Sequence, residues 1–171
     1  IDQYEDPVII ISDPKTGESL MSSARLRDIT GSSFQVRLQQ PNAETTSGQG
    51  PQAEVSYVVI ETGQWYFQGG MMITAGHFAS NKLSTDGFNR IPLSGYDESP
   101  IIFTQVQTYN DTDFVVTRTC RQTAQSFDVT MQEEEYLLGS GHGRETIGWI
   151  AVSASSEGAV ISGVSPRRVT S

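Results

Sequence analysis

The chain has 171 residues, of which 18% are charged, and its formal net charge at pH 7 is −9. This acidity argues against a nucleic-acid partner, which would need a basic stripe on the surface. The chain contains no window of about 18 consecutive apolar residues, which would indicate a membrane-spanning helix. Its single cysteine, Cys120, excludes an intrachain disulfide.

Short apolar runs separated by turn residues dominate the N-terminal third of the chain. Residues 1–6 are polar and acidic, and the chain opens abruptly at Ile1, which suggests a piece of a longer protein. Alternation of apolar and polar residues in Phe34–Gln39 is the period of a half-buried strand. Strands are predicted at 8–11, 20–27, 34–39 and 55–60, with turns at 13–17 and 28–32 and a polar loop at 41–52.

The middle of the chain carries two more apolar runs, at 65–67 and 71–73, followed by a polar stretch from Ser80 to Asn89 that we predict to be a loop. Strands then follow at 100–107, 114–121, 126–132 and 145–153, with an acidic loop at 133–144. The one helix candidate, 132–138, is short and ends in glycines. Strands joined by short turns, with no helical stripe, predict an antiparallel all-β sandwich.

The C-terminal half is nearly a second copy of the first third. Residues 7–40 fall on 100–133 after a shift of 93 positions, and 55–60 fall on 147–152 after a shift of 92. The shift pairs Phe34 with Phe127 and Tyr57 with Trp149. We therefore predict two tandem β-sandwiches of about six strands each, with the first domain at 1–75 and the second at 76–171.

Several residues of the second copy resemble the core of the H-type lectin domain: Pro100 to Phe103, Arg118, Phe127 with Val129 and Met131, and Ile147 to Val152. The resemblance covers 100–153 best and 7–61 less well. It implies a six-stranded antiparallel β-sandwich, binding of galactose-type sugars and assembly as a homo-trimer.

The sugar-contacting residues of that family are not reproduced. Its Trp-His pair falls at Glu134-Glu135 here and at Pro41-Asn42 in the first copy. Its sugar-contacting Arg falls at Phe114 in the second copy and at Met21 in the first. The resemblance therefore implies the fold and leaves the ligand open.

The acidic loop is the main candidate site. Carboxylates and His accept hydrogen bonds from sugar hydroxyls, and an aromatic ring offers an apolar face. The same carboxylates could hold Ca²⁺ or perform glycoside hydrolysis, and the plain alternative is a solvated charged loop. The predicted carbohydrate-binding residues are Glu133, Glu134, Glu135, Tyr136, His142 and Arg144, with Tyr66 from the consecutive aromatic run outside the loop.

The sequence thus predicts a non-catalytic carbohydrate-binding module for a glycan or polysaccharide, secreted or extracellular and part of a larger protein. It predicts no catalytic residues, no metal ligands and no cofactor, with Ca²⁺ left open. The alternative is a structural, assembly or Ca²⁺-dependent adhesion domain of a surface or fibre protein.

Overall fold

The computed structural model describes residues 4–14, 23–39, 54–67, 69–134, 141–153 and 167–168. All regular structure within these residues is β-strand, which confirms the all-β prediction. None of them belongs to a helix that could cross a membrane.

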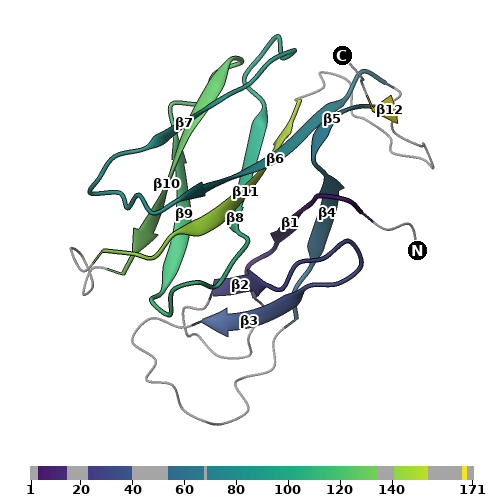
Figure 1. Cartoon of the computed structure of the whole chain (residues 1–171). Helices are drawn as coiled ribbons and strands as arrows, with labels where there is room; N and C mark the ends of the chain where they lie inside the picture. The colour runs from purple at the N-terminus through teal and green to yellow at the C-terminus, as the bar shows by residue number, and fades with distance from the viewer. Residues whose placement is uncertain are drawn as a thin grey trace.

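The larger part of the fold is a β-sandwich of two sheets (Figure 1). Its five-stranded sheet has the order β12-β5-β6-β11-β8, and its three-stranded sheet has the order β7-β10-β9. Alternate residues of β10, namely Phe127, Val129 and Met131, point between the sheets and are fully buried. The strands are β5 (Gly63–Tyr66), β6 (Met72–Ser80), β7 (Asn89–Pro92), β8 (Ile101–Val106), β9 (Val115–Cys120), β10 (Ser126–Glu133), β11 (Glu145–Val152) and β12 (Arg167–Arg168).

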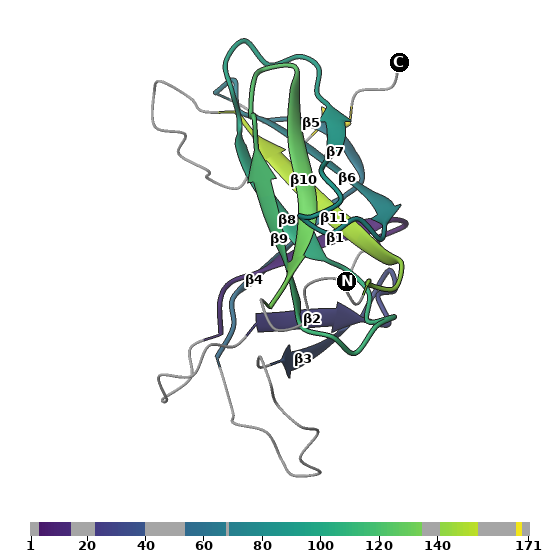
Figure 2. The ribbon, with the colours of Figure 1, turned by 90° about the vertical axis from the view of Figure 1, so that its left-hand side faces the viewer.

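The N-terminal part forms two two-stranded ribbons, one of β1 (Pro7–Ile11) with β4 (Tyr57–Glu61) and one of β2 (Ser23–Arg27) with β3 (Gln35–Gln39). Ile9 and Val59 from one ribbon pack against Leu26 of the other. The opposite face of the β1–β4 ribbon packs on the five-stranded sheet through Val8 and Ile150. Figure 2 shows β2 and β3 below the long strands of the sandwich.

The side chain of Gln107 joins the β1–β4 ribbon to the sandwich. The amide of Gln107 accepts a hydrogen bond from the Ile9 N–H at 3.0 Å and donates one to the Ile9 carbonyl at 2.6 Å. It therefore satisfies the backbone of β1 as a neighbouring strand would. There is no room for a side chain on Gly148, since a Cβ there would lie 2.7 Å from the Gln107 side chain.

The strand pairings of the two parts coincide under the shift found in the sequence. Here the first unit is Pro7–Glu61 with β1 to β4, and the second unit is Ile101–Val152 with β8 to β11. Ile9 pairs with Val59 as Ile102 pairs with Ala151, and Arg25 pairs with Arg37 as Arg118 pairs with Thr130.

The turns of the two units match as closely as the strands. Asp28 and Arg121, 93 residues apart, are the two non-glycine residues with positive φ in the described chain, at 52° and 49°. In each unit a Thr N–H then donates to the carbonyl of the Ser three residues on, at 2.8 Å, for Thr30 and for Thr123. The turn after β2 therefore has the same local geometry as the turn after β9.

Most of the predicted strands are present, with shifted ends. β6 runs through to Ser80, and β7 at Asn89–Pro92 lies where we predicted the end of a loop and a connection. In the helix candidate, Gln132 and Glu133 lie in β10, and 135–138 fall outside the described residues. The predicted domain boundary after residue 75 falls inside β6. The described chain holds one sandwich and two ribbons, so two complete tandem sandwiches stay a prediction.

Candidate functional site

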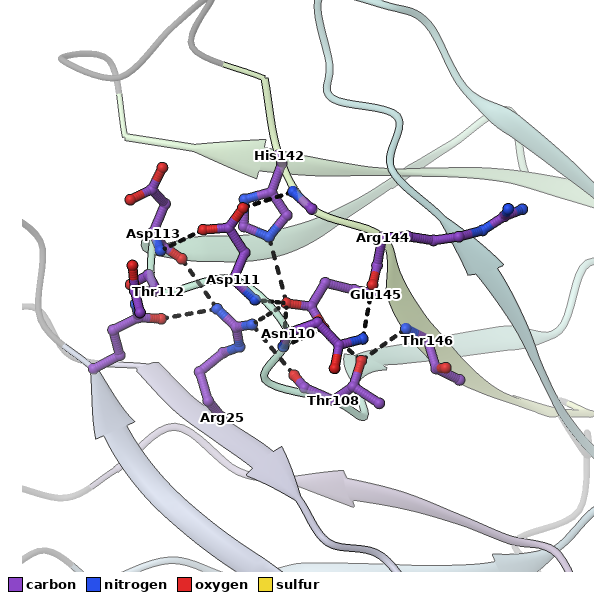
Figure 3. Close-up of polar contacts among 12 residues, drawn as sticks. Arg25, Thr108, Asn110, Asp111, Thr112, Asp113, His142, Arg144, Glu145 and Thr146 are labelled. Atoms are coloured by element: carbon purple, nitrogen blue, oxygen red, sulfur yellow. Dashed lines mark hydrogen bonds and ion pairs between the residues drawn. The ribbon is translucent and has the colours of Figure 1, made fainter.

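A buried polar network joins the first unit to the second (Figure 3). Its centre is Arg25 on β2, whose neighbours Ala24 and Leu26 point into the apolar core of the ribbons. Strand alternation turns Arg25 to the opposite face, where it is only 1% exposed. Its guanidinium donates to the carboxylate of Glu145 at 2.8 Å.

The two terminal nitrogens of the Arg25 guanidinium also bond to oxygens on both sides of the junction. Arg25 donates to the Gln39 side-chain oxygen at 2.9 Å and to the carbonyls of Thr108 and Asp113, each at 3.2 Å. The Gln39 amide donates in turn to the Thr112 carbonyl at 2.6 Å. The segment between β8 and β9 is thereby held against β2 and β3.

Glu145 begins β11 and is 1% exposed. It also accepts hydrogen bonds from the Thr108 hydroxyl at 2.5 Å and from the backbone N–H groups of Asn110 and Asp111 at 3.0 Å. Burial alone raises the pKa of Glu145, but the nearby His142 ring and the hydrogen bonds from Thr108 and the two amides outweigh burial and hold that pKa at about 2. Glu145 is therefore a carboxylate at any ordinary pH.

His142 lies between two buried glutamates. Its Nδ1 is 2.9 Å from Glu133 Oε1 and its Nε2 is 3.6 Å from Glu145 Oε1, and none of the three side chains is exposed. Burial lowers the pKa of His142, but the nearby carboxylate of Glu145 and the hydrogen bond to Glu133 outweigh it, so the pKa lies above its ordinary value. Burial raises the pKa of Glu133 beyond what its bond to His142 can offset.

The loop from β8 to β9 completes the network. Asp111 accepts hydrogen bonds from the backbone N–H of Gly143 at 2.6 Å and of Asp113 at 3.1 Å. These bonds outweigh the effect of its burial and lower the pKa of Asp111. Asn110 donates to the Arg144 carbonyl at 2.7 Å. Residues 143 and 144 are thus bonded to the loop that Arg25 also holds.

The arrangement is suited to holding the two units together. Its central groups are buried, and groups of opposite charge lie next to one another, as buried charges require. Among the residues that the structure describes, no three His, Cys, Asp or Glu side chains are placed to hold a metal ion. Calcium binding by the acidic loop stays a prediction.

The residues predicted to contact a glycan are placed as follows. Glu133 and His142 lie together, but their side chains are enclosed and bonded to each other. Glu134 is half-buried, and Glu135 and Tyr136 fall outside the described residues. Arg144 is exposed at the edge of the network, and Tyr66, 42% exposed, lies apart on β5. Their role in glycan binding stays a prediction.

The sequence pattern does not single out Arg25, Glu145 and Asp111 as central residues. Charged residues are seldom fully buried unless they are paired, and a pairing over this distance is not visible in the sequence. The repeat does not reveal it either, because Arg25 aligns with Arg118, and Arg25 is buried whereas Arg118 is exposed.

A polar cleft of about 420 Å³ lies beside this network, also between the two units. From the first unit it is lined by Asp28 and Thr30, with Asp6 just before β1, and across it lie His77 of β6 and Thr108. Asp6 bonds to the His77 ring at 2.8 Å, yet both side chains keep exposed surface. Carboxylate, imidazole and hydroxyl groups therefore face solvent together here.

A second groove, of about 640 Å³, lies between the β1–β4 ribbon and the five-stranded sheet and is mainly apolar. Ile10, Ile60 and Ile150 line it, and the exposed rings of Tyr57 and Phe103 border it, at 61% and 45% exposure. Such a surface can be covered by another part of a larger assembly.

These features define an all-β domain whose two repeated units meet through a buried ionic network. No protein-family model matches the chain, and no solved structure matches it. The chain is similar to halomucin of Haloquadratum walsbyi, with 30% identity over 158 residues, or 87% of this chain. The chain spans only 2% of the length of halomucin. This match fits the prediction that the chain is a domain of a larger surface protein.

Proposed function

We propose that the chain is a non-catalytic structural module of a large extracellular surface protein, in which the two β units are joined so that they unfold together under force. The observation that carries this proposal is the buried pair of Arg25 and Glu145, which spans 120 residues and links the two units. The similarity to a small part of halomucin supports it, because the name denotes a mucin and mucins are secreted or surface proteins.

The proposal predicts a single mechanical unit. In single-molecule pulling between the termini, the strands from Pro7 to Val152 should yield in one step that releases roughly 500 Å, at about 3.5 Å per extended residue. Arg25→Met should divide this step in two by weakening the connection between the units, whereas Arg27→Met on the exposed face of β2 should not. Two independent steps in the unaltered chain would contradict the proposal.

Glycan binding is a second candidate, supported by the polar cleft between the units. Asp28, whose side chain is 62% exposed, can accept hydrogen bonds from sugar hydroxyls there. One charge-assisted hydrogen bond contributes about 1.5–3 kcal/mol, so Asp28→Asn should weaken binding about tenfold or more. Asn also tolerates the positive φ at this position.

A glycan array followed by affinity gels would test this second candidate. Glu98→Gln, an exposed acid outside the cleft, is the matched control. If Asp28→Asn binds as the unaltered chain does while Tyr136→Ala does not, the acidic loop is the binding site instead. Loss of binding in chelator would assign the carboxylates to Ca²⁺.

A further inference from the structure

The two units differ in what flanks them. In the second unit, β11 pairs with β8 on one side and β6 on the other, and β10 pairs with β9 on one side and β7 on the other. The equivalents in the first unit, β4 and β3, have only one strand neighbour each within the described residues. The strands equivalent to β6 and β7 are therefore absent from the described first unit.

The exposed surface of the first unit follows from this difference. Val36 is 40% exposed, whereas its equivalent Val129 is 0% exposed. Tyr57 is 61% exposed, whereas its equivalent Trp149 is half-buried against the core. In the second unit the covering side chains come from β6, β7 and the residues around them, namely Met72, Phe78, Leu83, Ile91 and Leu93.

We propose that the free edges of β4 and β3 are a docking site for a pair of strands with the sequence pattern of β6 and β7. In chain order β6 and β7 come before β8, so their equivalents come before β1. The source we assign is therefore the polypeptide on the N-terminal side of β1 in a longer chain. This inference rests on the repeat geometry and goes beyond the function proposed above.

The second unit also gives the register of the docked strands. Ala75 pairs with Ile150 and Ile91 pairs with Phe127. The equivalent partners are Val58 of β4 and Phe34, which comes directly before β3. A residue in the place of Gly76 would lie opposite Tyr57, and that place calls for a small residue, since a Cβ on Gly76 would meet the Trp149 ring at 2.8 Å.

The test uses the whole chain with a copy of its own residues 70–93 added directly before Ile1. Residues 1–6 then take the place of 94–99, and Pro7 that of Pro100, so the spacing of the second unit is reproduced. Hydrogen exchange should slow about tenfold or more at the amides of β4 and β3 that face away from β1 and β2. The Tyr57 ring should also become less accessible to a fluorescence quencher.

The control carries Thr74→Pro, Ala75→Pro, Arg90→Pro and Ile91→Pro in the added copy alone. Neighbouring residues of a strand point their N–H groups to opposite sides. Each pair of prolines therefore removes one N–H group that would donate to the docked strand's partner, β4 or β3. This control should leave exchange in β3 and β4 as in the unextended chain. Equal exchange in the extended chain and the control would overturn the proposal. So would a dimer of the unextended chain, seen by light scattering, in which the same amides of β3 and β4 are already protected from exchange.

Discussion

Phe34 lies edge-on against Tyr57, with ring centroids 5.1 Å apart, as Phe127 lies against Trp149 at 5.6 Å. These two aromatic pairs occupy equivalent positions in the two units. Only the second pair is covered on its far side, since Phe127 is 0% exposed and Phe34 is half-buried. The same contact therefore contributes differently to the stability of the two units.

Alanine substitutions should reveal that difference. Phe127→Ala removes a fully buried ring and leaves a cavity, so it should lower the free energy of unfolding by about 3–5 kcal/mol. Phe34→Ala should lower it by less than about half as much, because the ring already contacts water. Denaturant unfolding followed by circular dichroism measures both values. Equal losses would show that Phe34 is covered in solution.

The buried ion pair should behave as one unit in a double-mutant cycle. Arg25→Leu or Glu145→Leu alone leaves an uncompensated buried charge and should cost about 3–5 kcal/mol. The two changes together should cost less than their sum, since no lone charge remains. The exposed pair of Arg27 and Asp28 is the control, and Arg27→Ala should change stability by about 1 kcal/mol or less. Strict additivity at Arg25 and Glu145 would contradict the direct pairing.

Stability should pass through a maximum between about pH 4.5 and 6.5. The pKa of Glu145 is about 2 in the folded chain against an ordinary 4.5, so its contribution is complete above 4.5 and is lost as pH falls toward 2. The pKa of His142 is raised above 6.5, so its contribution is complete below 6.5 and is lost as pH rises through the folded pKa. The raised pKa of Glu133 also removes stability as pH rises from 4.5.

Thermal unfolding across pH would separate these contributions. Glu145→Gln should flatten the acid side of the profile, and His142→Gln should flatten the alkaline side. A profile of His142→Gln that keeps the full alkaline decline would show that another group is responsible for it.

Salt should stabilise the chain because its net charge is −9 at pH 7. Screening weakens repulsion among exposed carboxylates, so raising NaCl from about 0.1 M to 2 M should raise the Tm by roughly 3–8 °C. At a pH near the pI of about 4.6 the net charge vanishes, and the gain should shrink. An equal gain at both pH values would point to a general salt effect on burial.

Sequence periodicity was sufficient to find strands such as Phe34–Gln39, because alternation reports directly which face is buried. It missed the full length of β6, where Gly76 and His77 interrupt the apolar pattern. It also missed β7, which begins at the end of the loop predicted from Ser80 to Asn89. The buried network was less accessible still. Only the fold reveals that Arg25 meets Glu145, because their contact depends on the docking of two ribbons on a sandwich.

That long-range contact also sets an order of events during synthesis. Arg25 leaves the ribosome 120 residues before Glu145. At about 5–20 residues per second, roughly 6–24 s separate the two. Through that interval the first unit carries a cation whose partner does not yet exist, and the Gln107 side chain that completes β1 also comes 98 residues after Ile9. The N-terminal ribbons are therefore made first and fixed in place last.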